Sequence, residues 1–279
     1  MRKVLRKLIG LLPNRFVRAV GRLQFTVPIL APVIRKFASN LASGEGVIQS
    51  GVGQGLKFDA TYGYAGYILG TSEPEEQDLL ARVLRPGMVF YDLGANVGFY
   101  TILGAKLVGE QGKVFAFEPT PRLAEAVRAN AARNAFTNVT VVQVAAGERE
   151  GTAKFVDTEF SAGNRVARDG ADEGEATFEV RVTSVDAYVR ETGAPLPDVV
   201  MMDVEGAEID ALRGMRETLA AAKPVILCEV HWHGERMIAC FDEVLKPLGY
   251  TMRTYSGEPV PEGYVRYHAL ITPPQGAVV

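Results

Sequence analysis

The sequence predicts an α/β protein built around a doubly wound, mostly parallel sheet. From residue 88 onward, short apolar segments that fit buried strands alternate with segments of about 12 residues that carry apolar side chains at helical spacing. Hydrophobic residues make up 47% of the 279 residues and charged residues 23%, as in ordinary globular proteins. This composition excludes wholesale disorder, a collagen-like fibre and a multi-span membrane protein.

The net charge and the cysteine content narrow the functional classes further. The formal net charge is −3, so the chain as a whole is not drawn to nucleic acid, and we expect no nucleic-acid partner. Two cysteines, Cys228 and Cys240, cannot form a disulfide framework. Their number is typical of a reducing compartment, so we expect a cytoplasmic protein.

Residues 1–44 are expected to form a basic, helical N-terminal arm. They hold nine Lys or Arg residues and no Asp or Glu, whereas the rest of the chain holds 21 basic and 33 acidic residues. Residues 1–24 could lie on the inner membrane surface as a peripheral, interfacial helix, or could pack on the body of the protein. Arg15 and Arg18 argue against a secretory signal. Residues 27–34 are too short and proline-rich to span a membrane.

The elements that follow the arm can be predicted in chain order. Residues 45–84 form a lead-in, with short strands and turns in a glycine-dense stretch and then a helix over residues 73–84. Pro86 and Gly87 end that helix. Residues 85–275 form the main domain, whose predicted strands are MVFYDLG, KVFAFEP, VTVVQVAA, DVVMMDVEG and PVILCEVHW, with a last pair in TMRTYSG and YVRYHALIT. Helices are predicted between them, the first over residues 97–108.

Residues 147–186 interrupt this alternation. Residues 155–156 and 178–182 fit the two strands of an inserted hairpin, and a charged, glycine-rich segment lies between them. That segment is either a surface loop or a lid over the substrate, because long loops often cover sites.

The strongest local signal is a glycine loop between the first strand and the first helix of the main domain. It reads Asp92-Leu-Gly94-Ala-Asn96-Val-Gly98. Ligands of such sheets bind beyond the carboxyl ends of the strands, where Gly94 permits a tight turn and Gly98 permits close packing of the helix. The spacing differs from the Gly-x-Gly-x-x-Gly of dinucleotide sites. Asp92 would repel a pyrophosphate, and it favours the ammonium and sulfonium charges of S-adenosylmethionine.

Glu118 is the second signal, because it ends the second strand of the main domain. A carboxylate at that position accepts hydrogen bonds from the hydroxyls of a ribose. The alternative is a surface Glu that caps the following helix, which begins at Thr120-Pro121.

Four motifs, in this order and spacing, resemble the FkbM family of S-adenosylmethionine-dependent methyltransferases: VFYDLGANVGFYT, VFAFEPTP, MMDVEGAE and VILCEVH. The resemblance implies a Rossmann-like class I methyltransferase fold, a seven-stranded sheet with a reversed last strand. It also implies cofactor contacts for Asp92, Gly94, Asn96, Gly98, Glu118, Asp203 and Glu205. The family commonly has a Lys at the position of Met201, which leaves the role of that position open.

Methylation of a hydroxyl also needs a group that removes the proton. Asp203, Glu229 and His231 follow the fourth and fifth strands, and His231 is the predicted base because a free imidazole has a pKa of ~6.5. With Glu205 they could instead bind a divalent cation. Their spacing is no dedicated metal motif, so we predict no metal. Tyr62, Tyr64 and Tyr67 could form a wall for the acceptor or pack within the fold.

The sequence therefore predicts a methyltransferase that uses S-adenosylmethionine to methylate a hydroxyl of a secondary metabolite, a glycan or a lipid-linked sugar. Two alternatives stay open at this point. One is an NAD-dependent oxidoreductase on a similar sheet, and the other is a membrane-associated, non-catalytic protein with a degenerate pocket.

Overall fold

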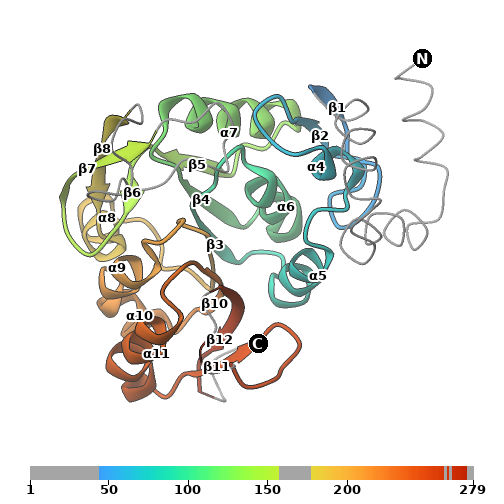
Figure 1. The fold of residues 1–279 in the computed structure, drawn as a ribbon. Helices are drawn as coiled ribbons and strands as arrows, with labels where there is room; N and C mark the ends of the chain where they lie inside the picture. Colours follow the sequence, from blue (N-terminus) through green and yellow to red (C-terminus); the bar gives the residue numbers. More distant parts are fainter. Residues whose placement is uncertain (1–43, 157–176, 261–262, 264–265, 275–279) are drawn as a thin grey trace.

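A computed structural model describes residues 44–156, 177–260, 263 and 266–274 of the chain (Figure 1). Nearly all of the predicted basic arm lies outside these residues, as does the charged, glycine-rich part of the predicted insertion. Within the described residues, no helix combines the length and the apolar character that crossing a membrane requires.

A seven-stranded sheet forms the centre of the protein, in the order β11-β12-β10-β9-β3-β4-β5. The neighbouring strands from β10 to β5 pair in parallel, and β12 runs antiparallel to both β10 and β11. This confirms the predicted doubly wound sheet with a reversed last strand. The strands are β3 (Val89–Leu93), β4 (Lys113–Phe117), β5 (Val139–Val142), β9 (Val199–Met202), β10 (Val225–Val230), β11 (Thr251–Thr254) and β12 (Tyr267–Thr272).

Helices cover both faces of the sheet (Figure 1). Along β3, Phe90 packs into one core and Tyr91 into another, because successive side chains of a strand point to opposite faces. The Phe90 core includes residues of α5 (Pro74–Val83) and α6 (Phe99–Val108), and α7 (Pro121–Arg133) packs beside α6. The Tyr91 core includes residues of α8 (Val185–Thr192), α9 (Glu208–Arg213), α10 (Arg216–Ala222), α11 (Gly234–Cys240) and the π-helix η3 (Phe241–Leu245), which the 3-10 helix η4 (Lys246–Leu248) follows.

The lead-in contains the predicted short strands and helix. β1 (Glu45–Val47) and β2 (Lys57–Asp59) form an antiparallel pair, and α4 (Ala65–Leu69) follows them. Two asparagines hold β2 against α7: Asn130, within the helix, and Asn134, its C-cap residue. Asn130 Oδ1 accepts from the backbone N–H of Asp59, and Asn134 Oδ1 accepts from that of Lys57, both at 2.8 Å. The lead-in also shares the Phe90 core.

The inserted segment forms a small sheet of its own, in the order β6-β8-β7. β7 (Gly151–Val156) and β8 (Thr177–Thr183) form the predicted hairpin and begin earlier than expected. The predicted single strand VTVVQVAA is wrong, because it divides into β5 and β6 (Ala145–Ala146), and β6 pairs with β8. The chain leaves the central sheet at the polar residue Gln143, which lies between the two strands.

Candidate functional site

The glycine loop bends over the carboxyl ends of β3 and β4. The backbone N–H groups of Gly94 and Ala95 both donate to the carbonyl of Phe117 at 3.0 Å. Gly94, Asn96 and Gly98 all have positive φ angles, of 88°, 53° and 84°. The predicted helix starts later than expected, at Phe99, because Gly98 is its N-cap and has a left-handed backbone. The bend therefore turns the loop toward the space beyond the sheet.

Asp92 is buried at the end of β3. Its Oδ2 accepts a hydrogen bond from Thr101 Oγ1 of α6 at 2.5 Å. Burial raises the pKa of Asp92 to about 7, although the bond from Thr101 opposes the rise. This side chain is thus held in one orientation at the start of the loop.

Glu118 connects the loop to the end of β4. It is buried, with 5% of its surface exposed, so the alternative of a surface residue is wrong. Its two oxygens accept from the backbone N–H groups of Asn96 at 2.9 Å and Thr120 at 2.8 Å. Burial raises its pKa to about 7, against the opposing effect of these bonds. The contact with Thr120 also places the start of α7 (Pro121–Arg133), so Glu118 has a structural role beside any ligand contact.

A cavity of about 460 Å³ opens beside Glu118. Its lining contains the loop residues Gly94 and Asn96 and, at the far side, Asp203 and Glu205. Asn96 Oδ1 is buried and has no hydrogen-bond partner among the residues described. The remaining wall is largely apolar and includes Leu123 of α7 and side chains that the sequence did not indicate, from the inserted sheet: Ala153, Phe155 and Val182.

A smaller cavity of about 70 Å³ adjoins the first, and Gly94, Asn96, Asp203 and Glu205 line both. Tyr64 and Tyr67 form part of its wall, with their rings edge to face at 5.7 Å between centroids. Tyr62, the third tyrosine of the predicted wall, has the guanidinium of Arg122 over its ring. The wall also contains Asp92, Met201 and Glu229, which the sequence analysis named, and Arg266, which it did not.

The predicted catalytic residues come together around His231, which follows β10 and is fully buried. Its Nε2 lies 3.3 Å from Glu229 Oε1, 3.6 Å from Glu205 Oε2 and 3.8 Å from Asp203 Oδ1. On the other side of the ring, Nδ1 lies 2.8 Å from Oε1 of Glu208. The sequence did not indicate Glu208, although it belongs to the motif MMDVEGAE.

The pKa values of His231 and Asp203 determine which of the two could accept a proton from a substrate. Burial lowers the pKa of His231, but the contacts with Glu208 and Glu229 outweigh it and raise the pKa to about 10. An imidazole that keeps its proton at neutral pH cannot accept another one. Burial and the nearby Glu229 raise the pKa of Asp203 well above its ordinary value. The cluster as it stands therefore favours Asp203 over His231 as the proton acceptor.

Glu229 differs from its neighbours because it is paired with a cation. Arg266 Nε donates to Glu229 Oε1 at 2.9 Å. Burial alone would raise the pKa of Glu229, but its electrostatic interactions with His231, His268 and Arg266 hold the pKa well below the ordinary value. Glu229 is therefore a weak proton acceptor.

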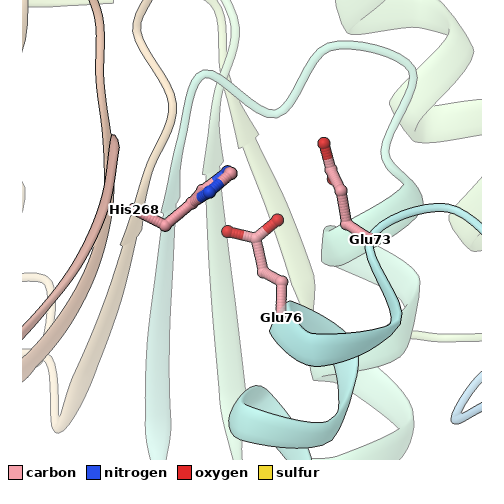
Figure 2. Close-up of side chains that lie close together, drawn as sticks. All are labelled: Glu73, Glu76 and His268. Carbon is pink, nitrogen blue, oxygen red and sulfur yellow. The ribbon is translucent and has the colours of Figure 1, made fainter. Parts of the chain in front are cut away.

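A second group of titratable side chains, Glu73, Glu76 and His268, lies close together, and Glu73 also lines the smaller cavity. In Figure 2, Glu73 and Glu76 lie at the start of the helix α5, and His268, which belongs to the strand β12, faces Glu76. Glu76 is buried, and its two oxygens accept from Tyr100 at 2.6 Å and from Tyr255 at 2.8 Å. Through these two hydrogen bonds, Glu76 joins α5 to α6 and to the residue that follows β11.

Comparison with known proteins places the chain among methyltransferase sequences. Residues 92–252 match the family described as the methyltransferase FkbM domain. The hexuronic acid methyltransferase AglP of Haloferax volcanii is 30% identical over 161 residues, which are 56% of this chain and 62% of AglP. The 2-O-methyltransferase NoeI of Sinorhizobium fredii is 25% identical over 161 residues, 53% of this chain and 65% of NoeI.

The chain spans less than two thirds of the length of either of these curated relatives. Among solved structures, a methyltransferase FkbM from Methylobacillus flagellatus KT matches with a TM-score of 0.44 and 16% identity. That match covers 75% of this chain and 53% of the other.

Proposed function

Because the chain belongs to the FkbM methyltransferase family, we propose that it transfers a methyl group from S-adenosylmethionine to a hydroxyl group of a sugar-containing acceptor. The observation that carries the proposal is the pair of adjoining cavities. One is bordered by Glu118 and the glycine loop, the other by tyrosines and acids, and Asp203 and Glu205 line both. Family membership also favours this function over the NAD-dependent oxidoreductase.

The larger cavity fits a nucleoside. Glu118 would accept from the ribose hydroxyls, because its oxygens retain lone pairs beyond those that bind Asn96 and Thr120. The unpartnered Oδ1 of Asn96 offers a further acceptor to a donor of the ligand. Leu123 and Phe155 supply apolar surface on which a purine could pack.

The acids at the junction of the two cavities fit the charges of the methionine part. S-adenosylmethionine supplies a methyl group that the positive sulfur has already activated. Asp92, Asp203 and Glu205 line the smaller cavity and would attract the ammonium and sulfonium charges. They would also place the methyl group toward the acceptor, and the alignment of two reactants is a large part of what such a site contributes.

The proton of the acceptor is the second requirement. As the acceptor oxygen bonds to the methyl carbon, the carbon–sulfur bond breaks and its electron pair stays on sulfur. We assign removal of the hydroxyl proton to the set of Asp203, Glu229 and His231. Within it, Asp203 Oδ1 is the best suited acceptor, because it is buried and no described residue donates a hydrogen bond to it.

The acceptor class rests on the relatives and on the smaller cavity. The names of AglP and NoeI specify a hexuronic acid and a 2-O position. Here the half-exposed ring of Tyr64 offers apolar surface, whereas Tyr67 is buried and stacks on Phe99. The surrounding acids accept hydrogen bonds from hydroxyls. A glycan or a lipid-linked sugar fits these features.

Calorimetry with S-adenosylmethionine and its demethylated product, S-adenosylhomocysteine, tests the proposal. We expect both to bind the full chain, and we expect transfer of labelled methyl groups to glycan or lipid-linked sugar extracts. NADH serves as the control ligand and should not bind. A folded sample that binds neither methylated nor demethylated cofactor would refute the proposed function.

We predict that cofactor affinity falls as the pH is lowered below about 7. Glu118 and Asp92 both have a pKa raised to about 7, so acid protonates them and removes the negative charges that the ligand contacts. The dissociation constant of S-adenosylhomocysteine should rise as the pH falls through about 7, by up to about tenfold for each group that becomes protonated. Calorimetry between about pH 5.5 and 7.5 measures the change.

The variant Glu118→Gln is the control for this pH dependence, because an amide does not titrate. Its profile should be flatter than that of the wild type. Equal affinity of the wild type across the whole range would contradict the assignment of ionised Glu118 and Asp92 to the binding site.

A further inference from the structure

We propose that Asp203, Glu205 and His231 form a binding site for a divalent cation such as Mn²⁺ or Mg²⁺, which takes the acceptor hydroxyl as a further ligand. The inference rests on the proposed function and explains how the acceptor hydroxyl would lose its proton. One ligand atom from each residue lies within 4.8 Å of the others. Carboxylate oxygens and an imidazole nitrogen together suit these ions.

The buried ring of His231 is the observation that points to a ligand. The side chain has no exposed surface, and its Nε2 has no hydrogen-bond partner in the part of the chain that the structure describes. This atom faces Asp203 and Glu205. A buried nitrogen left without a partner costs free energy, so a ligand that occupies this space would stabilise it.

Glu208 holds the ring of His231 in an orientation that suits metal binding. Its Oε1 lies 2.8 Å from His231 Nδ1, and it also accepts from the backbone N–H of Gly206 at 3.0 Å. Glu208 is itself buried, so the ring is held firmly. A carboxylate that accepts from Nδ1 orients the ring with Nε2 toward the ligand, as in most metal-binding histidines. A metal ion bound at Nε2 would displace the proton that this atom carries in the metal-free protein.

Asp203 and Glu205 reach the same point because the chain turns sharply after β9. Glu205 has a left-handed backbone with a φ of 49°, and Gly206 follows with a φ of 102°. Asp203 Oδ1 is buried and receives no hydrogen bond from the described residues, like His231 Nε2. Two unpartnered atoms from different strand ends, β9 and β10, therefore face one space.

The spacing of the carboxylates around Nε2 is wider than a hydrogen bond requires. Glu229 Oε1 lies 3.3 Å away, and Glu205 and Asp203 lie 3.6 and 3.8 Å away, beyond the usual 2.7–3.2 Å of an N–H···O hydrogen bond. Ligands that each bind one ion at about 2.1 Å lie about 3.0–3.6 Å apart. Slight inward movement of the side chains would produce that geometry.

Charge also favours a cation at this place. Asp203, Glu205, Glu208 and Glu229 surround the ring, and Arg266 pairs with Glu229. Buried carboxylates are stabilised when a positive charge compensates them. Glu229 is not counted as a ligand, because Arg266 already donates to its Oε1.

The position of the site suggests what the cation does. Asp203 and Glu205 line both cavities, so an ion bound there lies between the donor and the acceptor. Three protein ligands leave coordination positions for water and for a hydroxyl of the acceptor. With the ion in place Asp203 is a ligand, so it no longer takes the hydroxyl proton itself. Binding to the ion lowers the pKa of the hydroxyl, and its proton leaves to water before the oxygen attacks.

Mn²⁺ titration of the full chain, followed by the electron paramagnetic resonance of free Mn²⁺, tests the inference without any cofactor. We expect one bound ion per chain. Glu205→Gln and His231→Gln should each weaken Mn²⁺ binding at least tenfold. Glu205 is partly exposed, so its variant should fold even if the His231 variant does not.

Glu125→Gln is the matched control, because Glu125 is an exposed acid of α7 that pairs with Arg128. It should leave Mn²⁺ affinity unchanged. Glu73→Gln tests the other group that could hold a metal, shown in Figure 2, and should weaken Mn²⁺ binding less than Glu205→Gln does. Absence of bound Mn²⁺, unchanged affinity in Glu205→Gln, or a larger loss in Glu73→Gln than in Glu205→Gln would overturn the inference.

Calorimetry with S-adenosylhomocysteine separates the two proposals. Cofactor binding without Mn²⁺ binding overturns only the cation site, whereas Mn²⁺ binding without cofactor binding overturns the proposed function.

Discussion

Replacing Gly94 with Ala should lower the free energy of unfolding by about 2–5 kcal/mol. A non-glycine residue in the left-handed region costs about 1–2 kcal/mol, and Gly94 has a φ of 88°. In addition, a Cβ at this position would lie 1.8 Å from the carbonyl oxygen of Asp203. Forcing an atom into a packed site costs about 1–3 kcal/mol. Urea unfolding of the purified variant measures the loss.

Gly87→Ala is the control that separates these two effects. Gly87 has the same φ of 88°, but a Cβ there would meet no atom within 4 Å. The control should therefore lose only the conformational part, about 1–2 kcal/mol. If both variants were equally destabilised, the close approach of Gly94 to the carbonyl of Asp203 could not be a cause of the loss.

This close approach joins the two halves of the site. Gly94 belongs to the glycine loop, and Asp203 belongs to the acid cluster around His231. The backbone N–H of Asp203 also donates to Leu93 at 2.9 Å. Any displacement of the loop therefore moves the proposed acceptor of the hydroxyl proton as well, so we expect cofactor binding and proton removal to be coupled.

Much of the fold could be predicted because its central strands are covered on both faces. Strands such as β3 and β10 are buried along nearly their whole length, and this produces continuous apolar segments that stand out from the helical pattern between them. The break after β5 could not be predicted in the same way. Val142 and Ala145 are both apolar, and the pairing of β6 with β8 depends on a strand about 40 residues away.

The residues of the site also differ in whether a short segment of sequence is enough to predict them. The glycine loop and Glu118 are local signals, because turn chemistry and the end of a strand are visible in a short segment. Glu208 could not be assigned in advance, since an acid in the first turn of a helix is ordinary there. Its function depends on the contact with His231, which lies 23 residues away in the sequence.

The same limit applies to the proton acceptor. A histidine at the end of a strand suggests a base because its ordinary pKa suits neutral pH. The surroundings of His231 change that expectation, as the carboxylates of Glu208 and Glu229 hold a proton on the ring. Only the folded arrangement brings these groups together, so the sequence could name the members of the cluster but not the role of each.

Replacing Glu118 with Ala should weaken binding of S-adenosylhomocysteine about 100-fold or more. Each hydrogen bond to a charged group contributes about 1.5–3 kcal/mol, and a carboxylate that holds both ribose hydroxyls makes two of them. The same change leaves the backbone N–H groups of Asn96 and Thr120 without their acceptor, so the glycine loop should also become less ordered. Calorimetry gives the affinity, and a thermal melt shows the folded fraction.

Glu118→Gln distinguishes the loss of charge from the loss of the side chain, because the amide keeps one oxygen that can accept. We expect it to bind about tenfold more weakly than the wild type, since one charged bond is lost. Glu125→Ala changes an exposed acid of α7 that pairs with Arg128, and it should leave the affinity unchanged. If a folded Glu118→Ala variant bound the ligand within about threefold of the wild type, less than 1 kcal/mol would depend on this carboxylate. In that case the cofactor would have to lie elsewhere than between the glycine loop and the end of β4.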